Sequence, residues 1–183
     1  MFEKIIDVHI HPLLTLITEN DLLTEIRKAN VDLGVLLALD VDPNDLELPE
    51  IRNMISQRCL NLYVWDTPRV IEEMKRLLQT IKTDNEQVAS LVKRYPNKFI
   101  GFGSINLSKS DMRVEEKIRE IEKLDLMGIK LIPTLQFFNP IKVSKKMERV
   151  FEYCEKKGKI VMCHTGCDPY VWEYPGFSED ANP

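Results

Sequence analysis

The chain contains three histidines, and each stands where a strand could present it to a metal ion. His9 and His11 lie in the stretch IIDVHIHP, and His164 lies in IVMCHTG. Side chains two residues apart in a strand share a face, so the spacing predicts two adjacent imidazoles with Asp7 on the same face. Both motifs follow apolar, β-branched runs, which are typical of buried strands. Each predicted strand therefore ends at a candidate functional site.

Three imidazoles form a donor set for one divalent cation. Catalytic zinc takes three protein ligands and keeps a further position for water, whose pKa it lowers towards neutrality. We therefore expect His9, His11 and His164 to bind a divalent cation such as zinc, manganese or iron. One alternative is that His9 and His11 bind no metal. Another is that Cys163 and Cys167 form a Cys/His zinc cluster with His164.

Composition excludes several classes of protein. The chain has 183 residues, is 44% hydrophobic and 30% charged, and can therefore bury a sizeable core. The net charge of −4 comes from interspersed signs without a basic stripe, which argues against a nucleic-acid partner. No apolar run approaches the roughly 20 residues that span a bilayer, and the N-terminus lacks a signal-peptide pattern. We expect a cytoplasmic protein with no membrane partner.

Strand and helix signals alternate along the chain. Apolar runs predict strands at 4–11, 33–39, 98–107, 129–132 and 160–164. Periodic segments with polar flanks predict helices at about 21–29, 83–94, 112–124 and 145–157. Asn20 or Asp21 is expected to cap the first helix, and a capping box from Thr83 to Glu86 is expected to open the second.

The segment from about 41 to 82 interrupts this alternation. It is rich in proline and contains an amphipathic stretch that predicts a helix over 70–81. We call this segment the insertion.

The alternation indicates parallel strands and an α/β fold, either a doubly wound sheet or a TIM (β/α)8 barrel. Histidines at the ends of the first and fifth strands favour the barrel, because its active site collects residues from the carboxyl ends of several strands. A barrel needs eight units and about 250 residues, whereas five units are visible here. Residues 1–183 are therefore expected to form the N-terminal part of one barrel domain. A completing chain segment or a homo-oligomer would supply the rest.

Four stretches carry a resemblance to a known family: IDVHIHP, YPNKFIGFGSINL, LMGIKLIPTLQFFNP and IVMCHTG. Together they resemble the amidohydrolase superfamily, in particular amidohydrolase family 2, which includes aminocarboxymuconate-semialdehyde decarboxylase and related nonoxidative decarboxylases. The resemblance implies a single divalent ion, usually zinc, held by His9, His11 and His164. Family members add a catalytic histidine after strand six and an aspartate ligand after strand eight. Neither position is present in this sequence, so the general base stays unassigned.

Each of the other candidate site residues has two possible roles. Asp7 could orient a histidine ring or serve a structural role. Lys130 lies on the strand where some superfamily members carry a carbamylated lysine that bridges two metals. It could be modified in the same way, or it could pair with a carboxylate. Phe137 and Trp172, with Phe138, Tyr170 and Tyr174, are expected to line the substrate mouth or to cover the barrel rim.

The resulting hypothesis is a metal-dependent hydrolase that uses a metal-bound water on a small carboxylate, lactone, amide or ester, or a nonoxidative decarboxylase. A metal-dependent phosphoesterase or nuclease of a related barrel is one alternative. Such enzymes usually carry an acidic bridging ligand on strand four, where this chain has Lys130. A noncatalytic binding protein built on a partial barrel is the other alternative.

Overall fold

The computed structural model describes residues 4–61, 63 and 65–165. Its strands are β1 (Ile6–Ile10), β2 (Leu33–Leu37), β3 (Phe99–Ser104), β4 (Gly128–Leu131) and β5 (Ile160–Cys163). The helices that connect them are α1 (Glu19–Lys28), α4 (Asn85–Arg94), α5 (Asp111–Lys123) and α6 (Ser144–Lys157). Between β2 and α4 lie the 3-10 helix η1 (Pro43–Glu47), α2 (Pro49–Asn61) and α3 (Thr67–Ile81). None of the helices in these residues is long and apolar enough to cross a bilayer.

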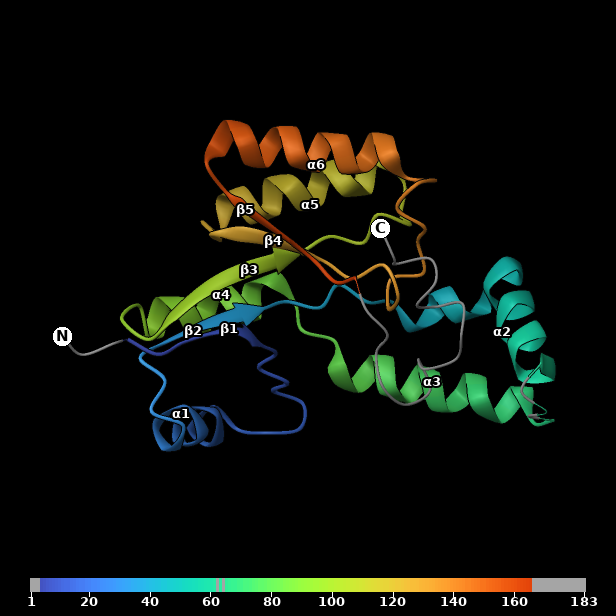
Figure 1. Cartoon of the computed structure of the whole chain (residues 1–183), viewed down its shortest axis with the longest axis horizontal. Helices are drawn as coiled ribbons and strands as arrows, with labels where there is room; N and C mark the ends of the chain where they lie inside the picture. Colours follow the sequence, from blue (N-terminus) through green and yellow to red (C-terminus); the bar gives the residue numbers. More distant parts are fainter. Residues whose placement is uncertain (1–3, 62, 64, 166–183) are drawn as a thin grey trace.

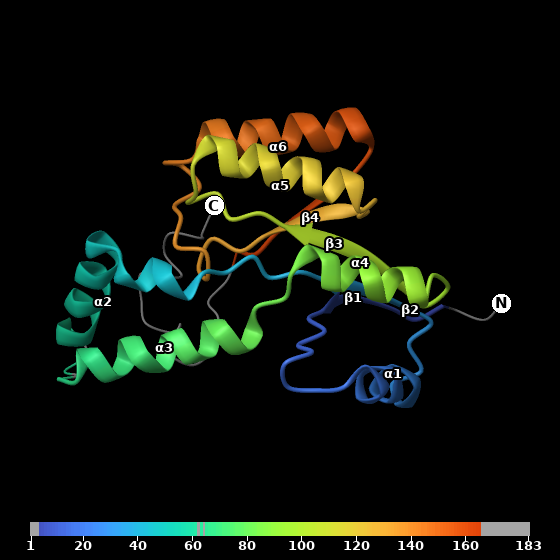
Figure 2. The ribbon, with the colours of Figure 1, turned by 180° about the vertical axis from the view of Figure 1, so that it is seen from behind.

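The strand order shows which α/β architecture the chain adopts. All neighbouring strands are parallel, and the order in the sheet is β1-β2-β3-β4-β5. Each new strand is thus added next to the preceding one at the same edge of the sheet. In a doubly wound sheet, by contrast, the strand order reverses and later strands are added at the opposite edge. Helices α1, α4, α5 and α6 pack on the outer side of the curved sheet (Figure 1). In Figure 2, which shows the molecule from behind, α4 lies in front of the strands. The predicted barrel-type fold is confirmed as a half-barrel of five strands.

Alternate residues of the strands face the connecting helices and form the outer core. This core contains Leu36, Ile129 and Leu131 of the sheet, packed with Leu22 and Ile26 of α1, Leu91 of α4, Ile121 of α5 and Val150 of α6. The opposite, inner face carries a smaller cluster of Val35, Leu37 and Phe102, with Ile100 and Met162 against it. On β1 the side chains of Ile6 and Val8 are open to solvent, at 51% and 57% exposure, whereas Ile10 is buried in the outer core.

The insertion folds as η1, α2 and α3, beyond the carboxyl ends of the strands (Figure 1). It has a core of its own, the insertion core, which also includes residues that follow β2 and β4. The buried members of the insertion core are Leu39, Val41, Leu46, Ile51, Ile55, Cys59, Val70, Ile71, Met74, Leu78, Ile132 and Leu135. The sequence predicted one helix here, and the structure adds α2. Its apolar residues Ile51, Ile55 and Cys59 recur every fourth position and are buried.

The helix caps differ from the predicted ones by one to three residues. Thr18, rather than a later residue, caps α1: its Oγ1 accepts from the backbone N of Asp21 at 3.2 Å, and the Asp21 carboxylate accepts from the Thr18 backbone N at 2.9 Å. At α4 the capping residue is Asp84, whose backbone N donates to the Gln87 side chain at 2.8 Å. Thr83 instead pairs its backbone with Leu39. A side-chain cap was predicted at the start of both helices, but the predicted capping residues were wrong.

Gly128 is a position where the sheet has no room for a side chain. A Cβ there would lie 2.5 Å from the Ile160 carbonyl oxygen and 2.5 Å from a ring carbon of Phe102. We expect Gly128→Ala to lower the free energy of unfolding by about 1–3 kcal/mol, as overpacking does, measured by urea denaturation. Gly158→Asn is the control, because Gly158 has a left-handed φ of 62° and no neighbour within 4 Å, and asparagine tolerates that conformation. Equal midpoints for wild type and Gly128→Ala would contradict the packing described for β3, β4 and β5.

The open inner face of β1 predicts self-association. Ile6 and Val8 present adjacent apolar surface that water contacts unfavourably. We expect the full chain to form dimers or larger species in sedimentation velocity, and an Ile6→Thr/Val8→Thr variant to shift towards monomer. Met112→Thr is the control, since Met112 is 69% exposed but lies on α5. A wild-type chain that remains monomeric at all concentrations would contradict the prediction.

Candidate functional site

A β-bulge in β1 decides how its polar side chains point. Asp7 pairs with Gly34 and Ile10 pairs with Leu36, so three steps along β1 match two steps along β2. The extra residue shifts the alternation and puts Asp7 out of phase with His9. The expectation that Asp7 shares the ligand face is therefore wrong. Its carboxylate instead accepts a hydrogen bond from the backbone N of His9, at 2.9 Å.

The two histidines at the end of β1 converge. The Nε2 atoms of His9 and His11 lie 3.1 Å apart, and their rings are inclined by 70°. Nδ1 of His11 lies 3.3 Å from the carbonyl oxygen of Leu37, at the end of β2. A carbonyl oxygen can only accept, so Nδ1 carries the proton and Nε2 of the neutral ring carries the lone pair. The sheet thus holds His11 in the tautomer that can bind a cation through Nε2.

The pair fits a metal ion. Metal-binding histidines commonly donate their second ring N–H to a backbone carbonyl, as His11 does here. Two nitrogen ligands at ~2.0–2.1 Å from a tetrahedral zinc lie about 3.3–3.4 Å apart. The observed separation of 3.1 Å is close to that spacing. A hydrogen bond between the two Nε2 atoms accounts for the same contact when no ion is bound.

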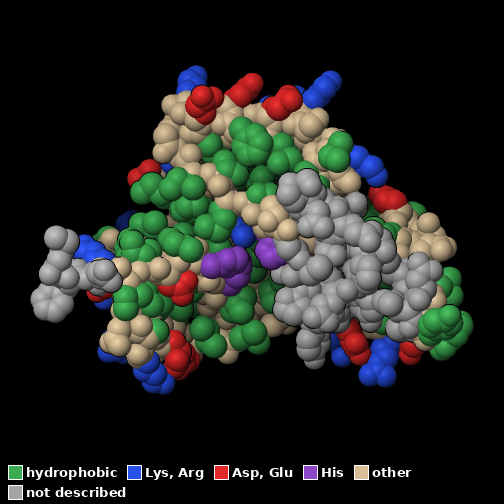
Figure 3. All heavy atoms as spheres, viewed as in Figure 1, with side chains coloured by type: hydrophobic (Ala, Val, Ile, Leu, Met, Phe, Trp, Pro, Cys, Tyr) green, Lys and Arg blue, Asp and Glu red, His purple; other side chains and the backbone are tan. Residues whose placement is uncertain are grey.

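His164 follows β5 and is half-buried. Its backbone N donates to the Leu131 carbonyl at 2.9 Å, and the preceding Cys163 packs against the outer core. Strand alternation therefore directs His164 to the inner face. In Figure 3 the histidine side chains lie in the middle of the face shown. Within the described residues, however, no three His, Cys, Asp or Glu side chains are grouped so that they could hold an ion. The structure brings His9 and His11 together, and the participation of His164 stays a prediction.

Lys130 is buried on the inner face of β4, with 1% of its surface exposed. It is in register with Ser104 of β3 and Met162 of β5. Burial raises the pKa of the Cys163 thiol, and the positive charge of Lys130 acts on it in the opposite direction. A basic side chain therefore lies on the same face as the histidines, and its modification to a carbamate stays a prediction.

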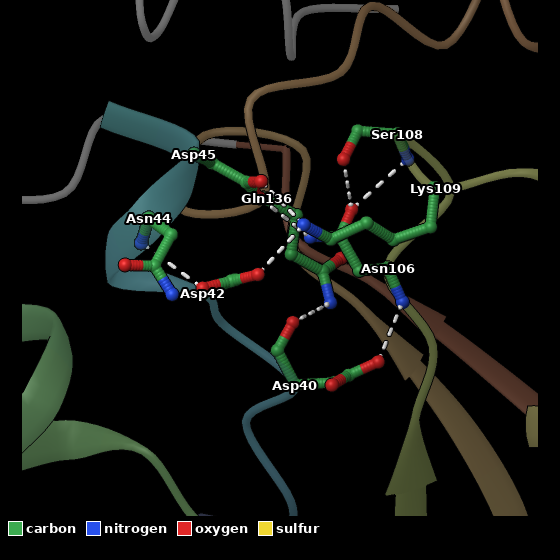
Figure 4. A network of polar contacts seen from close by, with 8 residues as sticks. All are labelled: Asp40, Asp42, Asn44, Asp45, Asn106, Ser108, Lys109 and Gln136. Atoms are coloured by element: carbon green, nitrogen blue, oxygen red, sulfur yellow. Dashed lines mark hydrogen bonds and ion pairs between the residues drawn. The ribbon is translucent and has the colours of Figure 1, made fainter. Parts of the chain in front are cut away.

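Gln136 ties three strand ends together, a role that sequence reasoning missed. Its Nε2 donates to the Asp40 carbonyl and to Ser104 Oγ, each at 3.1 Å, and its Oε1 accepts from the backbone N of Ile132 at 3.0 Å. The side chain is completely buried, and Figure 4 shows its bond to Asp40. The available signal was a long polar residue within the apolar stretch IPTLQFF, because such a residue must find partners when buried.

Lys109 attaches the insertion to the loop after β3 (Figure 4). Its Nζ contacts Asp42 at 2.9 Å and also binds Asp45, which accepts a further hydrogen bond from Asn106 at 3.3 Å. Burial raises the pKa of Asp45. Burial also acts to raise the pKa of Asp42, but hydrogen bonds from Lys109 and Asn44 hold it below its usual value. The single Lys109 ammonium bridges both carboxylates, which makes this cluster an anchor for η1.

The predicted substrate-binding aromatics divide into two groups. Phe137 is half-buried, has a left-handed φ of 51° and packs against the insertion core, as does Leu13. Phe138 is 4% exposed and belongs to the outer core. Trp172 lies outside the described residues, as do Tyr170, Tyr174 and Cys167. Phe137 is thus the one candidate whose place beside the strand ends the structure describes.

Comparison with known proteins agrees with this fold. No family model matches the chain. Over 92 residues it is 32% identical to a 2-amino-3-carboxymuconate-6-semialdehyde decarboxylase from Dictyostelium discoideum. That match covers 50% of this chain and 23% of the relative.

Solved structures match over nearly the whole chain. An uncharacterised TIM-barrel protein from Bordetella bronchiseptica superimposes with a TM-score of 0.58 and 17% identity, covering 98% of this chain and 62% of that one. A 2,6-dihydroxybenzoate decarboxylase from Rhizobium gives a TM-score of 0.50 and 10% identity, covering 96% and 55%. The matches therefore cover less than two thirds of each of these proteins, from 23% of the curated relative to 62% of the Bordetella protein. The predicted resemblance to decarboxylases of this kind is confirmed: the chain is similar in sequence to one such decarboxylase and in fold to TIM-barrel proteins.

Proposed function

We propose that this chain carries metal ligands of a metal-dependent enzyme of the amidohydrolase type, which hydrolyses or decarboxylates a small carboxylate substrate. The observation that carries the proposal is the approach of the His9 and His11 Nε2 atoms to 3.1 Å, with the tautomer of His11 set by Leu37. His164 is the third ligand in this proposal. The ion is divalent, with zinc preferred and manganese or iron as alternatives.

The chain's own side chains have separate tasks in this proposal. A bound divalent ion supplies Lewis acidity and lowers the pKa of water there. His9 and His11 hold the ion as neutral imidazoles at the end of β1. Lys130 places positive charge on the same inner face, which favours an anionic substrate. Phe137 offers an apolar surface at the turn after β4 for the rest of that substrate.

A substrate with a carboxylate group is favoured over a neutral amide or ester. The curated relative is named as a decarboxylase of a carboxylic acid, and this chain carries the buried Lys130 on the inner face of β4. Hydrolysis differs from decarboxylation in how the substrate engages the ion, so both reaction types remain within the proposal.

The proposal includes further strands over the open inner face. Ile6 and Val8 of β1 and Ile160 of β5 are each about half exposed or more, at 51%, 57% and 54%. Three more β/α units would complete the eight of a closed barrel and cover both edges. We propose that a completing chain segment, or failing that a second copy of this chain, supplies this cover in the active protein.

Metal binding tests the proposed function directly. We expect the purified full chain to bind about one zinc, manganese or iron ion per chain, measured by equilibrium dialysis with elemental analysis. His9→Ala and His11→Ala should each weaken binding by more than about 100-fold, beyond the loss of a supporting contact. His164→Ala should weaken it as well. A wild-type chain without stoichiometric metal would contradict the proposal, whereas two ions per chain would favour a carbamylated Lys130.

Asp7 offers a separate test of how the pair is supported. Because its Oδ1 accepts from the His9 backbone N, an uncharged acceptor should serve equally well. We expect Asp7→Asn to leave metal affinity unchanged and Asp7→Ala to lower it by about 10-fold, the lower end for a lost supporting group, as measured by competition with a chelating dye. If Asp7→Asn weakens binding as much as Asp7→Ala, the negative charge itself supports the metal.

A further inference from the structure

We propose that the insertion positions His11 for metal binding through Leu13 and Thr15, two residues of the loop after β1. This inference rests on the proposed function, and it assigns to the insertion a role in metal affinity in addition to any contact with substrate.

Two adjacent leucines after His11 enter different cores. Leu13 packs against the insertion core, and Leu14 packs against the outer core. Pro12 between His11 and Leu13 is buried and has a fixed φ, so little freedom separates the ligand from these contacts. Both cores therefore determine where the backbone of His11 lies.

Leu13 holds an unfavourable conformation. Its φ is 34°, in the left-handed region that side chains other than glycine rarely adopt. Its carbonyl oxygen accepts from the backbone N of Leu16 at 2.8 Å and of Ile17 at 3.2 Å, which closes a tight turn. Strained backbone of this kind persists where surrounding contacts determine it and is common at ligand sites.

A polar contact joins the same loop to the end of α3. Thr15 Oγ1 donates to the carbonyl oxygen of Thr80, one residue before α3 ends at Ile81. Apolar packing at Leu13 and this hydrogen bond thus connect the loop to the insertion at two points.

The insertion is itself held firmly to the half-barrel. The backbones of Leu39 and Thr83 exchange hydrogen bonds of 2.9 and 3.3 Å, and Lys109 holds the residues of η1. Met74 and Leu78 of α3 are completely buried. A folded insertion is therefore a fixed support, and the loop that leaves His11 is seated on it. Metal ligands need this kind of support, because a loosely held ligand loses affinity.

The experiment compares variants of the loop by zinc affinity of the full chain, measured by competition with a chelating dye, together with urea denaturation. We expect Leu13→Ala to weaken zinc binding by about 10-fold, as loss of a supporting contact does. Leu13→Met should restore affinity because it keeps the apolar contact. Leu16→Ala is the matched control: it removes the same atoms from the same loop, but Leu16 is 61% exposed.

Thr15→Val provides a second variant, in case Leu13→Ala does not fold. Thr15 is exposed, so this change removes the hydroxyl that binds Thr80 with little cost to packing, and we expect it too to weaken zinc binding. Wild-type affinity in both Leu13→Ala and Thr15→Val, or an equal loss in Leu16→Ala, would overturn the inference while leaving the proposed function intact. A wild-type chain that binds no zinc, manganese or iron would overturn both.

Discussion

The close approach of two imidazoles at the end of β1 is the constraint on which the candidate site depends. Two nitrogens 3.1 Å apart need a backbone that presents both rings to the same side and a partner that selects the tautomer. The bulge before His9 and the Leu37 carbonyl beside His11 meet these two requirements. Because Leu37 belongs to β2, the geometry of the pair depends on parallel pairing between the first two strands as well as on the sequence of β1.

The same end of the sheet concentrates polar groups that an apolar interior would otherwise exclude. Lys130 and Ser104 lie in register on the inner face, and the Gln136 side chain bonds to Ser104 and to the backbones after β2 and β4. A buried polar group destabilises the folded protein unless it is hydrogen-bonded. Gln136 satisfies this condition for the groups that it bonds at the ends of β2, β3 and β4, and Lys130 lies in register with one of them, Ser104.

Local patterns predicted much of this arrangement, and contacts between distant segments account for what they missed. A two-residue spacing was enough to place His9 beside His11. The alternation of strands and helices predicted an α/β fold, and the histidines at two strand ends favoured the barrel. The phase of Asp7 could not be read from β1 alone, since a bulge is defined by the register with β2. The helix α2 was missed because its apolar side chains are buried by α3 and by the residues that follow β2 and β4, which are distant contacts that the local sequence does not reveal. The role of Gln136 depends on partners 32 and 96 residues away.

The half-barrel also explains how metal ligands can be organised while the inner face of β1 is open. Ile10, between the two histidines, is buried in the outer core, and Leu14 packs against that core as well. Leu13 is supported from the other direction by the insertion. Neither support requires inner-face packing, where Ile6 and Val8 are more than half exposed. Further strands over the inner face would therefore enclose a histidine pair whose geometry the outer core and the insertion already determine.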